Sequence, residues 1–97
     1  MAVKAILKEL QSLIKQLTIV QQEPKNAYQF VREYYGNYIR SLHDISKNKV
    51  VQDVTGPVIT VLRIGMNRSP MWKKSSQCMD HFGLLSRTLR GAINKLS

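Results

Sequence analysis

Residues 28–45 read YQFVREYYGNYIRSLHDI, and their apolar positions recur at steps of three and four residues. This spacing predicts an amphipathic helix of about five turns with a narrow apolar seam. The seam consists of Tyr28, Val31, Tyr35, Tyr38, Leu42 and Ile45. Gly36 falls inside the stretch, but a single glycine costs a helix only about 1 kcal/mol relative to alanine. We therefore expect one helix that begins near Pro24 and ends at residues 46–49, where the apolar spacing stops.

Upstream, residues 3–17 read VKAILKELQSLIKQL and carry the same spacing of three and four. Their apolar stripe predicts a further amphipathic helix. This helix should end near Val20, because Glu23 precedes Pro24 and a residue before proline is disfavoured in the helical conformation. Two helices joined by so short a link predict a helical hairpin over residues 3–47.

Downstream, residues 50–64 are mostly β-branched and fit two structures. They could form two strands that turn at residues 55–57, or a helix with Pro57 at its start or at a kink. The helical stripe would consist of Val50, Val54, Val58, Val61 and Leu62. A lone β-hairpin beside two long helices would be poorly supported, so a third helix is the favoured interpretation.

The C-terminal part predicts a basic loop followed by a last helix. Residues 66–77 interrupt the apolar spacing with Asn67, Pro70, Ser75 and Ser76, and Asp80 is the expected N-cap of the helix that follows. The seam of this helix consists of Phe82, Leu85, Leu89, Ile93 and Leu96. We therefore expect residues 1–97 to form one all-α domain: a small helical bundle with a helical hairpin, a third helix, a basic loop and a C-terminal helix.

The charge of the chain predicts an acidic partner. Fifteen Lys and Arg residues against six Asp and Glu give a net charge of +9, and residues 60–97 hold seven basic residues beside Asp80 alone. A nucleic acid, an anionic membrane surface and an acidic protein would all suit this charge, and Trp72 beside Lys73 and Lys74 could serve each of them. The sequence contains no recognised nucleic-acid-binding motif and no apolar run long enough for a transmembrane segment.

Catalytic or metal chemistry is not indicated. Cys78 and His81 are three residues apart and could share a helical face, but they offer too few metal ligands and lack a third group to orient a nucleophile. A half-buried cysteine and a surface histidine are the expected outcome. The five glycines do not cluster into a phosphate-binding loop, and each carboxylate has a Lys or Arg nearby to pair with. We therefore expect no enzyme, no catalytic residue, no metal site and no resident cofactor.

Three tyrosines on the seam of residues 28–45 permit two interpretations. Tyr28, Tyr35 and Tyr38 could lie at the helix edges with solvated hydroxyls, because a buried tyrosine O–H needs a partner. They could instead line a channel with polar lips that admits an acyl chain or the side chains of a partner.

The order of these features resembles the LYR-motif (Complex 1 LYR-like) superfamily of small basic mitochondrial proteins. The resemblance rests on ILKEL at residues 6–10, AYQFVRE at 27–33, VLR at 61–63 and, more faintly, FGLL at 82–85. The spacing is most similar to the branch that contains the assembly factor for the F1 sector of mitochondrial ATP synthase. This sequence has LKE at residues 7–9 in place of a Leu-Tyr-Arg triplet.

The resemblance implies a three-helix bundle that acts as an adaptor, assembly factor or chaperone in the mitochondrial matrix. Its partner would be the acidic acyl carrier protein, whose acylated phosphopantetheine arm threads the bundle, or a subunit of a respiratory complex or ATP synthase. The matching positions are Lys8, Arg32 and Arg40. With the cations of the C-terminal half, the candidate partner-binding residues are Lys8, Arg32, Arg40, Arg63, Lys73, Lys74, Arg87 and Arg90. The alternative is a small RNA-binding component of a ribonucleoprotein, such as a mitochondrial ribosomal protein.

Overall fold

A computed structural model of the chain describes residues 2–45 and 49–96. These two ranges are almost entirely helical and contain no strand, so the prediction of an all-α fold is confirmed. The elements are, in chain order, α1 (Ala2–Gln22), the 3₁₀ turn η1 (Pro24–Asn26), α2 (Ala27–Phe30), the π-helical turn η2 (Val31–Tyr35), α3 (Gly36–Ile45), α4 (Lys49–Arg68), the 3₁₀ turn η3 (Ser69–Met71) and α5 (Ser75–Leu96). The predicted end of the second helix at residues 46–49 lies mostly outside the described residues.

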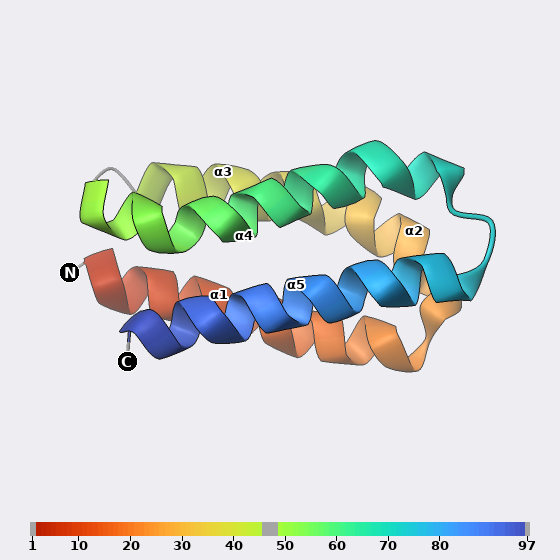
Figure 1. Cartoon of the computed structure of the whole chain (residues 1–97), viewed down its shortest axis with the longest axis horizontal. Coiled ribbons are helices and arrows are strands. Elements are labelled where there is room, and N and C mark those ends of the chain that lie inside the picture. The colour runs from red at the N-terminus through yellow and green to blue at the C-terminus, as the bar shows by residue number, and fades with distance from the viewer. Residues whose placement is uncertain (1, 46–48, 97) are drawn as a thin grey trace.

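The described elements form four antiparallel rods, because α2, η2 and α3 follow one another without a break (Figure 1). α1 packs against α3 and α5, and α4 packs against the same two helices. The turns η1 and η3 lie at one end of the molecule, hereafter the turn end, and both chain termini point to the other. The fold is thus an up-and-down four-helix bundle, elongated to 40 × 21 × 17 Å, with one long helix more than the family resemblance implies.

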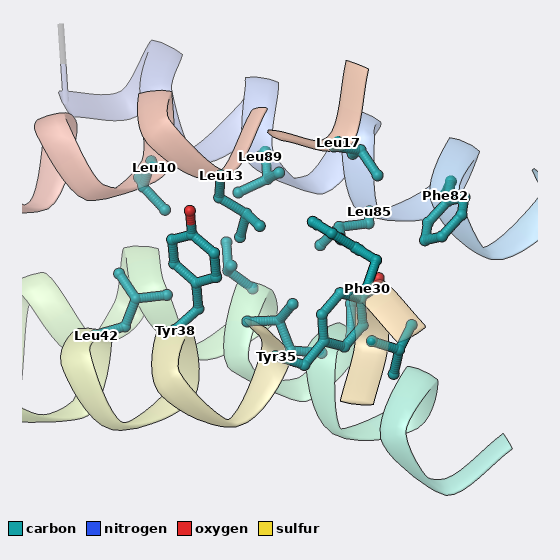
Figure 2. Close-up of a cluster of buried hydrophobic side chains, with 14 of the residues drawn as sticks. Leu10, Leu13, Leu17, Phe30, Tyr35, Tyr38, Leu42, Phe82, Leu85 and Leu89 are labelled. Carbon is teal, nitrogen blue, oxygen red and sulfur yellow. The ribbon is translucent and has the colours of Figure 1, made fainter. Parts of the chain in front are cut away.

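The core lies between the four rods, where their apolar stripes converge (Figure 2). The stripe predicted for residues 3–17 supplies Ile6, Leu10, Leu13 and Leu17, each at most 1% exposed. Val58 and Leu62 of α4, and Phe82, Leu85 and Leu89 of α5, are fully buried as well. The helical interpretation of residues 50–64 is therefore correct, although the side chain of Val50 lies outside the described part. Burying each of these large side chains contributes about 1.5–3 kcal/mol.

The π-helical turn η2 explains one departure from the predicted seam. Val31, Tyr35, Tyr38 and Leu42 are buried as expected, but Tyr28 is 47% exposed and Phe30 is buried in its place. A π-helical turn stacks residues five apart, so Phe30 and Tyr35 both face the core, with ring centroids 5.7 Å apart. The α-helical spacing of the sequence could not indicate this local rotation.

The predicted loop over residues 66–77 is wrong. α4 continues to Arg68 with Pro57 inside it, and only residues 72–74 separate η3 from α5. Asp80 is consequently inside α5 and is not its N-cap. The start of α5 is stabilised instead by Gln77, whose Oε1 accepts hydrogen bonds from the backbone N–H groups of Lys73 (2.7 Å) and Lys74 (3.1 Å), in the manner of a capping box.

Candidate functional site

An aromatic centre, buried except for the half-buried Trp72, occupies the turn end of the core. It consists of Phe30, Tyr35, Trp72, His81 and Phe82, whose rings pack with centroids 5.3 to 6.3 Å apart. Its polar link is a hydrogen bond of 2.8 Å between the Tyr35 hydroxyl and Nε2 of His81. His81 is only 8% exposed, so the expectation of a surface histidine is wrong. The reason is its position four residues before Leu85, which places it on the inward side of α5.

Burial controls the protonation of this pair. Loss of solvent on burial and, to a smaller extent, the positive charge of Arg68 together lower the pKa of His81 to about 4. Burial also raises the pKa of Tyr35 above its ordinary value. Both groups are therefore neutral at pH 7, and with the imidazole proton on Nδ1 the tyrosine donates its hydroxyl proton to Nε2.

Gly65 of α4 provides the space for this pair. A Cβ atom at this position would lie 2.5 Å from Nε2 of His81 and 2.6 Å from Cε2 of Tyr35. Both contacts are far below ordinary van der Waals separation, and both involve rings fixed in the core. Glycine is thus required here by the close approach of two neighbouring rods.

The three seam tyrosines do not line a common channel. Tyr35 is fully buried, Tyr38 is 8% exposed with its hydroxyl 3.1 Å from Oγ of Ser12, and Tyr28 lies on the surface. The rings of Tyr35 and Tyr38 are part of the core and fill space between the rods that a channel would need (Figure 2).

Nothing in the described residues points to metal or thiol chemistry. They contain no group of three His, Cys, Asp or Glu side chains placed to hold a metal ion. Cys78 is buried, and its Sγ lies 4.0 Å from the carbonyl oxygen of Lys74. The described helices are also all too short or too polar to cross a membrane.

A basic groove opens at the turn end beside Trp72. This groove, hereafter the Lys groove, has a volume of about 500 Å³. It is lined by Lys25, Ala27, Tyr28, Trp72, Lys73, Lys74 and Cys78. Because η1 and the segment before α5 meet at this end, Lys25 joins the two lysines that the sequence analysis predicted. No carboxylate contributes to the lining, so all charged side chains of the groove are positive.

The remaining predicted cations are exposed but lie on other surfaces. Arg40 and Arg63 meet in a second groove between α3 and α4, hereafter the Arg groove, with a volume of about 370 Å³. The other four line neither the Lys groove nor the Arg groove: Lys8 is on α1, Arg32 on η2, and Arg87 and Arg90 on α5. The eight candidates therefore do not form one continuous site.

The cations are also not neutralised within the bundle. Among the side chains that the structure describes in residues 3–45 and 51–96, no Lys or Arg forms an ion pair with a carboxylate, contrary to the pairing expected from the sequence. Glu23 accepts a hydrogen bond from Asn26 (3.0 Å), and Glu33 accepts one from Gln29 (2.9 Å). The lysines of the Lys groove thus remain available to an external anion.

Two further grooves lie near the turn end. The first, hereafter the His81 groove, runs between the end of α4, η3 and α5 and has a volume of about 460 Å³. It is lined by Ile64, Arg68, Met71, Trp72, Gln77, Asp80, His81 and Leu84. The second, hereafter the Glu groove, lies between α1 and the α2–η2 segment, and its lining includes Ile19, Tyr34, Glu23 and Glu33. The Lys and Glu grooves therefore carry opposite charges.

Comparison with protein-family models, with curated proteins and with solved structures found no match to this chain.

Proposed function

We propose that this protein is a non-enzymatic adaptor that docks an acidic protein surface through the Lys groove. One observation carries the proposal: Lys25, Lys73 and Lys74 converge at one end of the bundle, and none of them is paired with a described carboxylate. Unpaired cations around a concave surface attract an acidic partner and orient its approach.

A protein partner accounts for more of this surface than RNA does. Met71, in the adjoining His81 groove, is an apolar side chain that is 67% exposed, and methionines are enriched at protein interfaces. The family resemblance suggests an acyl carrier protein, or an acidic subunit of a respiratory complex or ATP synthase, in the mitochondrial matrix. RNA binding is the second candidate, because Tyr28 and Trp72 beside three lysines could stack bases.

The test is calorimetric titration of an acidic acyl carrier protein into the full chain and into a charge-reversed variant. Lys73→Glu with Lys74→Glu should weaken binding by at least about tenfold. Lys4→Glu with Lys15→Glu makes the same charge change on the exposed side of α1, and should weaken it by no more than about threefold.

Equal losses in the two variants would mean that only net charge matters, and the Lys groove would then not be the site. Binding to single-stranded RNA but not to the acidic protein, with a steep loss of affinity as salt is raised, would favour the second candidate.

A further inference from the structure

The His81 groove differs in chemistry from the Lys groove that it adjoins. Its lining is largely apolar, with Ile64, Met71, Trp72 and Leu84, and Met71 and Leu84 are 67% and 39% exposed. The charges of Arg68 and Asp80 on its rim are opposite. A purely anionic ligand therefore gains little in this groove, whereas a large apolar side chain would remove exposed apolar surface from water.

The two grooves adjoin each other at one residue that they share. Trp72 lines both, with Lys73 and Lys74 on one side and Met71 on the other. The Trp72 ring packs against the rings of His81 and Phe82, and its centroid lies 5.3 and 6.3 Å from theirs. A single segment of a partner that crosses Trp72 would therefore touch a cationic surface and an apolar surface in succession.

The lining of the His81 groove also includes a buried polar group with unused hydrogen-bonding capacity. His81 is more than nine-tenths buried, and its Nε2 is engaged by Tyr35. Its Nδ1 makes no hydrogen bond to any described residue. Arg68 lies in the same lining, and its guanidinium forms no ion pair within the described residues. Both groups are hydrogen-bond donors, so they suit a carboxylate that accompanies an apolar side chain of the partner.

We infer that the acidic partner binds as an amphipathic helix: a large apolar side chain enters the His81 groove, while carboxylates on the same helix contact the Lys groove. The inference rests on the proposed function and specifies the partner chemistry further. A groove volume of about 460 Å³ accommodates one or two large side chains, and helix-in-groove recognition places such anchors three or four residues apart.

The experiment uses two synthetic peptides of equal length and equal negative charge. One alternates glutamate with serine and has no apolar face, and the other places leucines at helical spacing so that it forms an acidic amphipathic helix. Binding to the full chain is followed by the fluorescence of Trp72, the only tryptophan in the sequence, and by calorimetry. The amphipathic peptide should bind at least about tenfold more tightly than the serine peptide.

Three variants test which groove is responsible for the tighter binding of the amphipathic peptide. Leu84→Gln with Met71→Gln should abolish the advantage of the amphipathic peptide and leave the serine peptide unaffected, because both residues are exposed and the charge is unchanged. Ile19→Gln is the matched control, since Ile19 is 55% exposed but lies in the Glu groove. Lys73→Glu with Lys74→Glu should weaken both peptides.

The failure of the inference is distinguishable from the failure of the proposed function. If both peptides bind equally and the Lys groove variant weakens both, the Lys groove binds acidic segments but the apolar anchor does not exist. If Ile19→Gln alone removes the advantage, the anchor belongs to the Glu groove and the inference is overturned. If neither peptide binds, both proposals fail.

Discussion

Toward the chain termini the four rods meet mainly through leucines around Tyr38, whereas toward the turn end they meet around Phe30, Tyr35 and Phe82 (Figure 2). The rings of Trp72 and His81 pack against this second group. Leu10, Leu13, Leu42 and Leu89 represent the first region, and all four are fully buried. The aromatic centre represents the second, with one hydrogen bond at its middle and one glycine that makes room for it. The two regions depend on geometry to different degrees.

The two regions differ in how well they tolerate substitutions and in how closely they are linked to the proposed binding surface. Aliphatic packing has no preferred direction and accepts substitutions that conserve volume, whereas a buried hydrogen bond between two rings requires both partners in place. The aromatic centre is also the region that positions Trp72, and Trp72 forms the boundary between the Lys groove and the His81 groove. The less tolerant part of the core thus supports the proposed binding surface.

The largest expected effect is steric and belongs to the aromatic centre. Gly65→Val should lower the free energy of unfolding by about 3 kcal/mol or more, because the new side chain would overlap the rings of Tyr35 and His81. Gly91→Val in α5 is the matched control: a Cβ atom there meets no atom within 4 Å, so the change should be within about 0.5 kcal/mol of neutral. Urea unfolding of both variants measures the difference. Equal stabilities would mean that the rods do not approach closely at Gly65.

The second expected effect is a loss of stability in acid that originates in the aromatic centre. His81 has a pKa of about 4 when folded and an ordinary value of 6.5 when unfolded, so between these values the unfolded chain binds more protons. The free energy of unfolding should therefore fall as pH is lowered from about 6.5 to about 4, by at most about 3 kcal/mol. Denaturant unfolding across this pH range measures the slope.

His81→Gln supplies the control for the acid effect, because it removes the titrating group from the same position. Its stability should depend distinctly less on pH in this window than that of the parent chain. If both chains lose stability in parallel, the acid sensitivity comes from other groups, and His81 is more accessible to solvent than its position in the core indicates.

The sequence predicted the fold where apolar spacing is uninterrupted. The stripes of residues 3–17 and 28–45 each gave a helix, and together they gave the antiparallel hairpin. The prediction failed at residues 66–77, where the apolar spacing is interrupted although most of the segment is helical. Ser69 of η3 is buried, but it reads as a loop residue when its packing partners are unknown. Gln77 three residues after Lys74 was an available helix-start signal, because its side chain caps the backbone before α5.

The candidate site was predicted in part, for a similar reason. Lys73 and Lys74 follow from local charge, since they are adjacent to each other and to Trp72. Lys25 could not be assigned to the same site, because only the meeting of η1 with the segment before α5 brings it there. His81 could have been recognised as inward-facing from its spacing to Cys78 and Leu85, but nothing in the sequence identified Tyr35 as its partner.

The smallest expected effect compares two buried tyrosines on the same rod. Tyr35→Phe should lower the free energy of unfolding by about 1–3 kcal/mol, because it leaves Nε2 of His81 buried without its hydrogen bond. Tyr38→Phe should change it by about 0.5 kcal/mol or less, since Tyr38 bonds only to Ser12, which is exposed and can bind water instead. The two substitutions remove the same atom, so thermal or urea unfolding isolates the environment of the hydroxyl. A larger loss for Tyr38→Phe would contradict the distinction drawn between the two regions of the core, because the demanding hydrogen bond would then lie on the aliphatic side.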